Sequence, residues 1–167
     1  MLFDTRTNAL ETDERCSFAA LMELYENNYI FMRRLVPEPD RSEDVTVSRV
    51  NGTPDLHMQI LERCAYTTSL LLTHCFRSGG DPDVTPDLKV RVYHDARVAE
   101  VLPSSRLRGF SYWSGREPPA SGSLQWRWEV NRFLNRWLRY CLGEGHAFEA
   151  ADDARPAVRP EARRWSV

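Results

Sequence analysis

The stretch VTVSRVNGTPDLHMQI, residues 45–60, decides the class of fold. Apolar and polar residues alternate from Val45 to Val47 and again from Leu56 to Ile60, on either side of Asn51-Gly52. Such alternation is typical of a strand with one buried face, and Asn-Gly is a strong signal for a tight hairpin turn. The stretch therefore predicts a β-hairpin and, with it, an antiparallel sheet.

Three later segments have the composition of further strands. Residues 66–76 are rich in Thr and Leu, residues 88–92 alternate, and residues 98–101 are mostly apolar. Residues 78–82 (SGGDP) predict a loop. The alternation loses phase near residues 94–96, where we expect a turn or bulge. Because the connections are short, the strands are expected to form an antiparallel meander.

Two segments that flank the strands have helical periodicity. Apolar residues recur every three or four positions in residues 17–37 and again in residues 123–142. Ser17 and Ser123 are suitable N-caps, and Gly143 fits the stop of the second helix. The predicted fold class is therefore α+β: an antiparallel sheet of about five strands, with an N-terminal and a C-terminal helix packed on one face.

The apolar positions of these segments predict the core. The expected core residues are Phe18, Leu21, Tyr25, Met58, Ile60, Leu70, Leu72, Val90, Val92, Phe133, Leu134 and Trp137. Asn28 interrupts the apolar stripe of the first helix, and a buried Asn must find hydrogen-bond partners. We expect an internal backbone partner for Asn28 rather than a ligand.

Four strings of residues carry a resemblance to a known family. NNYIFMRRLVP (27–37), RVYHDARVAEV (91–101), SYWS (111–114) and NRFLNRWLRYCLGEGH (131–146) resemble the YqiB-like family, bacterial proteins with a domain of unknown function. The resemblance covers most of the predicted domain. It implies no activity, cofactor or catalytic residue, because the family has none established.

Length and composition predict one domain. The 167 residues carry a formal net charge of −2, which gives no overall attraction to nucleic acid or to an anionic membrane. We expect a flexible N-terminal arm at 1–15, a single domain at 16–147 and a disordered tail at 148–167. Four dispersed cysteines and the absence of a signal-like or membrane-spanning segment predict a cytoplasmic protein that does not bind membranes.

The weak catalytic candidates are His94, Asp95 and Glu100. A turn between two strands would bring His94 towards Glu100, and a His beside a carboxylate is suited to general acid–base chemistry. His and Asp are equally good turn residues that bond local backbone groups, and no nucleophile elbow accompanies them. The candidates support a hydrolase only as a further alternative, and whether the protein is an enzyme stays open, with a non-enzyme favoured.

No metal or cofactor site is expected. The spacing of His57, Cys64, His74 and Cys75 fits no zinc pattern, and neighbours on one strand point to opposite faces. The sequence also lacks the phosphate-binding, dinucleotide-binding and metalloprotease motifs.

A basic and aromatic surface is the main binding candidate. Its residues are Arg132, Arg136 and Arg139, which form one helical stripe, with Arg127, Trp113 and Tyr112 close to them in sequence. Arg and aromatic residues are enriched in protein interfaces and also serve single-stranded nucleic acid binding, while a charged helix face is often merely solvated. The favoured hypothesis is a non-catalytic interaction or regulatory protein with a protein partner, and the alternative is a nucleotide- or RNA-binding module.

Overall fold

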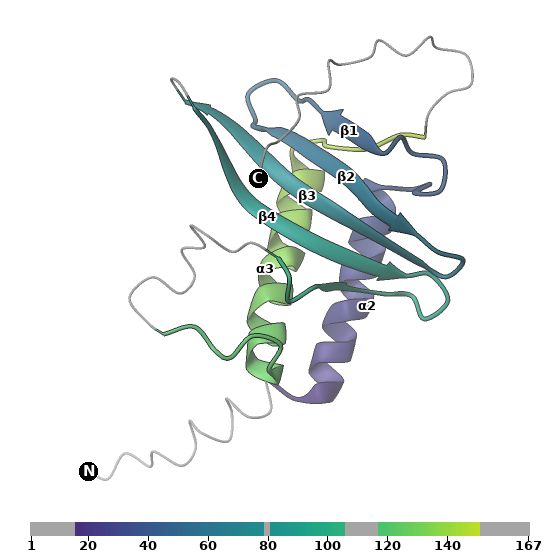
Figure 1. The fold of residues 1–167 in the computed structure, drawn as a ribbon, viewed down its shortest axis with the longest axis vertical. Coiled ribbons are helices and arrows are strands. Elements are labelled where there is room, and N and C mark those ends of the chain that lie inside the picture. The colour runs from purple at the N-terminus through teal and green to yellow at the C-terminus, as the bar shows by residue number, and fades with distance from the viewer. Residues whose placement is uncertain (1–15, 79–80, 106–116, 151–167) are drawn as a thin grey trace.

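The structure, a computed structural model, describes residues 16–78, 81–105 and 117–150 of the chain. Within this part, five strands form one sheet and two helices cover one of its faces (Figure 1). The elements in chain order are α2 (Phe18–Leu35), β1 (Val45–Ser48), β2 (Asp55–Arg63), β3 (Thr67–Ser78), β4 (Asp81–Tyr93), β5 (Val98–Val101) and α3 (Leu124–Gly143). The predicted α+β class is confirmed.

The sheet is the predicted meander. Its strands lie in the order β1-β2-β3-β4-β5, and every neighbouring pair is antiparallel. Gly52 in the predicted hairpin turn has a φ of 83°, a left-handed value that costs glycine little. The loop predicted at residues 78–82 is too long, because backbone pairing of β3 with β4 continues to Ser78 and Asp81.

Both helices begin at the predicted serine caps. The hydroxyl oxygens of Ser17 and Ser123 each accept a hydrogen bond from the backbone N–H three residues later, at 3.1 and 3.2 Å. Gly143 is the last residue of α3, and the left-handed position after the helix belongs to Gly145, with a φ of 91°. The predicted glycine stop is therefore displaced by two residues.

The two helices run side by side in the same direction behind the sheet (Figure 1). Leu24 of α2 and Trp128 of α3 belong to one apolar cluster, and Asn28 further along α2 bonds to Asn131 further along α3. The two helices are therefore parallel, and both carboxyl ends lie at the same end of the molecule.

The core lies between the helices and the sheet. Its fully buried members with the largest side chains include Met32, Leu35, Leu56, Met58, Leu70, Leu72, Leu88, Val90, Leu134, Leu138 and Phe148. One predicted core residue is wrong: Phe18 is 70% exposed. It opens α2, and the amino-terminal turns of both helices extend past the sheet, so no strand covers it (Figure 1). Phe133 is only partly buried.

The segment after α3 is held against the start of the sheet. The His146 ring lies between two hydroxyls, with Nδ1 3.0 Å from Ser48 Oγ and Nε2 3.2 Å from Thr53 Oγ1. Phe148 is buried, and its N–H donates to the carbonyl oxygen of Leu35 at the end of α2 (2.8 Å). Residues 146–148 are thus packed against the sheet and the end of α2.

Candidate functional site

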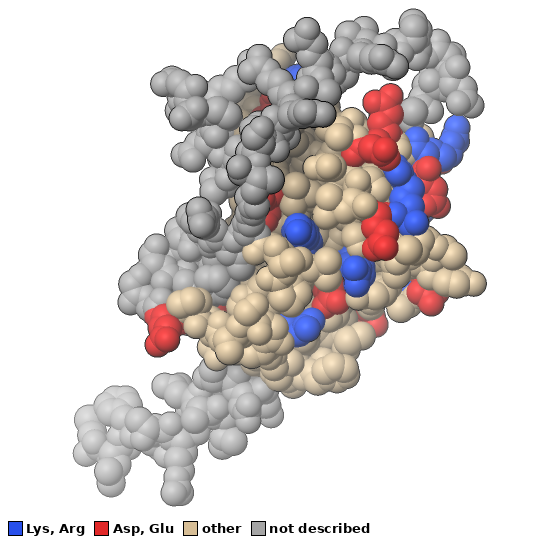
Figure 2. All heavy atoms as spheres, viewed as in Figure 1, with Lys and Arg blue, Asp and Glu red and all other residues tan. Residues whose placement is uncertain are grey.

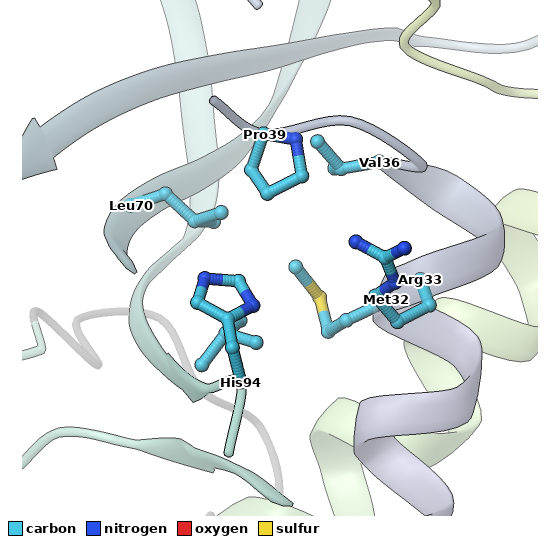
Figure 3. Close-up of a pocket in the computed structure, with 7 residues that line it drawn as sticks. Met32, Arg33, Val36, Pro39, Leu70 and His94 are labelled. Atoms are coloured by element: carbon cyan, nitrogen blue, oxygen red, sulfur yellow. The ribbon is translucent and has the colours of Figure 1, made fainter. Parts of the chain in front are cut away.

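His94 lies in the turn after β4, at the side of a small apolar pocket (Figure 3). Its Nε2 is 2.8 Å from Thr68 Oγ1, and its backbone N–H donates to the carbonyl oxygen of Tyr66 (2.8 Å). The other residues that line the pocket are Met32, Arg33, Val36, Pro39, Leu70 and Val92, none of them acidic. The volume of about 10 Å³ is room for roughly one water molecule.

Glu100 lies in a different environment, between β4, β5 and α3. Its Oε1 accepts a hydrogen bond from the Tyr93 hydroxyl (2.9 Å), and its Oε2 pairs with Arg127 Nη1 (2.8 Å). Arg127 also donates from Nε to the carbonyl oxygen of Gly122 (2.9 Å). Burial, followed by the bond to Glu100, raises the pKa of the Tyr93 phenol.

His94 and Glu100 point to opposite sides of the sheet. His94 bonds Thr68, which pairs with Val92, whereas Glu100 pairs with Arg91, the next residue along β4, whose side chain points the opposite way. Glu100 lies on the edge strand β5, where the Arg127 side chain reaches it from α3. Side chains alternate along a strand, so the short sequence distance between the two residues does not bring them together. The structure thus assembles no acid–base pair from them, and Asp95 is exposed in the turn.

Tyr25 of α2 also lies beside Glu100, a proximity that no spacing or motif in the sequence indicates. Its side chain is buried beside Arg127 and Glu100, yet its hydroxyl makes no hydrogen bond of ordinary geometry within the described residues. Burial is the largest cause that raises its pKa, to about 12. The charges of Arg127 and Glu100 neutralise each other. Together with Tyr25, this group brings residues of α2, α3 and β5 into contact.

A second polar network joins the two helices. Asn28 Nδ2 donates to the backbone oxygen of Asn131 (3.3 Å), and Asn28 Oδ1 accepts from Asn135 Nδ2 (3.0 Å). Asn131 Oδ1 in turn accepts the backbone N–H of Val101 on β5 (2.9 Å). The internal backbone partner predicted for Asn28 is therefore present.

The predicted arginine stripe lies on the surface of α3. Arg132, Arg136 and Arg139 are all exposed. Arg127 is not part of the stripe. Five residues separate it from Arg132, a spacing that turns its side chain to another side of α3, where it pairs with Glu100 of β5. Trp113 and Tyr112 lie outside the described residues.

Aromatic side chains support two exposed arginines near the line where the helices meet. The Arg132 guanidinium lies over the Trp128 ring, 5.7 Å from its centroid, and that of Arg34 over the Phe31 ring at 6.0 Å. Arg34 was not among the residues predicted from the sequence for the basic and aromatic surface. The i, i+3 and i, i+4 spacing of Phe31–Arg34 and Trp128–Arg132 was the available signal.

Buried histidines gather at the carboxyl end of α3, but they form no metal centre. The indole N–H of Trp137 donates to His74 Nδ1 (2.9 Å), and the His74 and His146 rings are 5.8 Å apart between centroids. Burial, followed by the nearby histidines, lowers the pKa of His74 to about 4. Across the described ranges, no three His, Cys, Asp or Glu side chains are placed to hold a metal ion.

Comparison with known proteins identifies the family. The family model described as "Protein of unknown function (DUF1249)" matches residues 31–147. The chain belongs to this family. Uncharacterized protein YqiB of Escherichia coli K12, a similar protein, is 32% identical over 132 residues, covering 77% of this chain and 90% of the relative. The YqiB proteins of strains O6:H1 and O157:H7 match equally well, while no solved structure matches significantly.

Membership of DUF1249 confirms the resemblance that the sequence strings indicated, and it places the chain among bacterial proteins of unknown function. The matched residues include all of the sheet and all of α3. None of the helices in the described ranges is both long and apolar enough to span a membrane.

Proposed function

We propose that this DUF1249 protein is a non-catalytic binding protein that holds an acidic protein partner on its helix layer. The proposed contact surface, here called the arginine face, consists of Arg34, Arg132, Arg136 and Arg139. Arg34 lies in the last turn of α2, and Arg136 and Arg139 in the last two turns of α3. Because the helices are parallel, the carboxyl-terminal halves of α2 and α3 lie side by side (Figure 1), and Arg34, Arg136 and Arg139 belong to these halves, with Arg132 near the middle of α3.

The observation that carries the proposal is the pair of guanidinium–aromatic contacts on the arginine face. These contacts place the guanidinium groups of Arg34 and Arg132 over aromatic rings, and the exposed guanidinium N–H groups are available to carboxylates. Among the described residues, no acidic side chain forms an ion pair with Arg34, Arg132 or Arg139. Arginines beside partly buried aromatic residues are among the residue types that dominate protein interfaces.

The charge balance favours a protein over a nucleic acid as the partner. Long-range attraction to a phosphate backbone requires an extended positive field, whereas the chain has a net charge of −2. Exposed Glu23 and Glu26 also lie on α2, towards the other end of the helix layer. A small group of arginines on a helix layer that also carries acidic residues suits an acidic patch of limited size.

The test is affinity capture from a lysate of the native host with a matched pair of variants. Arg132→Glu with Arg139→Glu changes the arginine face, and Arg41→Glu with Arg97→Glu alters net charge equally at exposed residues that are not part of it. We expect the wild type and the Arg41/Arg97 variant to retain one near-stoichiometric protein after nuclease treatment. The Arg132/Arg139 variant should lose at least about 90% of it, since paired charge reversals at an interface cost more than 1.4 kcal/mol.

Two outcomes contradict the proposal. Equal capture by both variants would remove the arginine face from the interaction. Recovery of nucleic acid that nuclease eliminates, with a steep loss on added salt, would replace the protein partner with RNA or DNA.

A further inference from the structure

The two edges of the sheet are protected to different extents. At the β5 edge, α2 packs against the strand and the Asn131 side chain caps the N–H of Val101 (2.9 Å). At the other edge, β1 pairs only with β2 within the described residues. An open edge strand offers unpaired backbone groups to another strand.

The pairing of β1 with β2 shows which backbone groups are open. The N–H of Ile60 donates to the oxygen of Asp44 (2.8 Å), so residues 44, 46 and 48 direct their backbone groups towards β2. The intervening residues Val45 and Val47 direct their N–H and C=O groups outwards. Their side chains lie opposite Gln59 and His57, on the face away from the helices, and Val45 is 54% exposed.

The charges around β1 are complementary to those of a second, antiparallel copy. Glu43 lies three residues before Thr46, and Arg49 lies three residues after it. Both are exposed, although Arg49 also pairs with Asp55 in its own chain at 3.4 Å. Figure 2 shows acidic and basic side chains intermixed around the part of the surface where β1 lies.

We propose that two copies of this chain associate through β1, in an antiparallel pair centred on Thr46. This register places Val45 opposite Val47 of the second copy, so the outward N–H and C=O groups of both residues meet as hydrogen-bonded pairs. It covers the exposed Val45 side chain with Val47 on the open face. It also sets Glu43 opposite Arg49 of the second copy, twice across the two-fold axis.

The small size of the contact sets its strength. Four-residue strands bury little surface, far below the area of a permanent dimer, so we expect a reversible dimer with a dissociation constant of about 10⁻⁵–10⁻⁴ M. The continuous sheet would then contain β1 of both copies at its centre.

Sedimentation equilibrium between about 10 µM and about 1 mM tests the pairing, since this range brackets the expected constant. Glu43→Arg and Arg49→Glu each create two like-charge pairs in a homodimer, and each should weaken it about tenfold. An equimolar mixture of the two variants restores an opposite-charge pair at both positions, so dimerisation should return to the wild-type level. Recovery on mixing separates intermolecular pairing from damage to either fold.

A backbone variant gives a second measurement. Val45→Pro removes an outward N–H and leaves the bonds between β1 and β2 intact, because proline is tolerated where a strand N–H faces away from the sheet. It should abolish the dimer while the melting temperature of the monomer stays close to that of the wild type. A wild-type protein that is monomeric up to about 1 mM, or a dimer that neither the single variants nor Val45→Pro weaken, would overturn the proposal.

Discussion

Asn131 connects three elements of the fold through one side chain and one carbonyl. Its Oδ1 accepts the N–H of Val101, its Nδ2 donates to the backbone oxygen of Arg127 (2.7 Å), and its own backbone oxygen accepts from Asn28. Its side chain is fully buried, so each bond replaces one that water would otherwise provide.

Replacing Asn131 with Leu should therefore destabilise the fold, although leucine has the same number and branching of side-chain heavy atoms. The N–H of Val101 would lose its partner in a site that water does not reach, at a cost of about 1–3 kcal/mol. Urea denaturation measures the loss, and Asn27→Leu on the exposed side of α2 is the control, expected within about 0.5 kcal/mol of wild type. Equal effects of the two changes would show that the buried amide contributes nothing specific.

At the same scale, the sequence predicted partners correctly only where they follow from local spacing. The serine caps follow from residues three positions apart on one helix. For Asn28 the sequence predicted only that the partner is an internal backbone group, and not that it is Asn131, 103 positions away on the other helix. The Arg127–Glu100 ion pair does not, because its members are 27 positions apart and meet only when α3 packs on β5. His94 was assigned to Glu100 by nearness along the chain, and the alternation of side chains across the sheet overrides that nearness.

The apolar pattern of each helix predicts which side of the helix is buried, but not which of its turns the sheet covers. Trp137, in the second half of α3, is 6% exposed and contacts His74 of β3, whereas Phe18 at the start of α2 extends beyond the sheet. Both belong to apolar stripes of similar regularity. The period identifies the buried side of a helix, but not how far along the helix the sheet reaches.

These two aromatic residues are predicted to differ sharply in their contribution to stability. Trp137→Ala should cost about 3–5 kcal/mol, because it removes a buried ring and leaves a cavity. Phe18→Ala should change the free energy of unfolding by less than about 1 kcal/mol, since its ring is mostly hydrated already. Chemical denaturation of both variants provides the comparison, and a large loss for Phe18→Ala would place that ring in a contact beyond the described residues.

For the molecule as a whole, buried histidines make stability depend on pH. His74 has a pKa of about 4 in the folded protein against 6.5 for an ordinary histidine, and burial also lowers the pKa of His146. Between these values the unfolded chain binds a proton that the folded chain does not. Stability is therefore complete above pH 6.5 and falls as the pH drops towards 4.

The loss from His74 alone should be on the order of 3 kcal/mol across this window. Urea denaturation at several pH values from 7 to 4 measures it. His74→Leu should be less stable than wild type at pH 7, because the Trp137 N–H loses its acceptor, yet it should lose less stability on acidification. Parallel pH profiles for the two proteins would show that His74 does not titrate as described.

The pairing of the first helix with the last also has a consequence for synthesis of the chain. The hairpins of the meander join neighbouring segments, so the sheet is complete in sequence by Val101, before α3 has been made. Its apolar face then has only α2 to cover it until residues 124–148 follow. A nascent chain with such an exposed apolar face is prone to aggregation. The face is covered only after α3 has been translated.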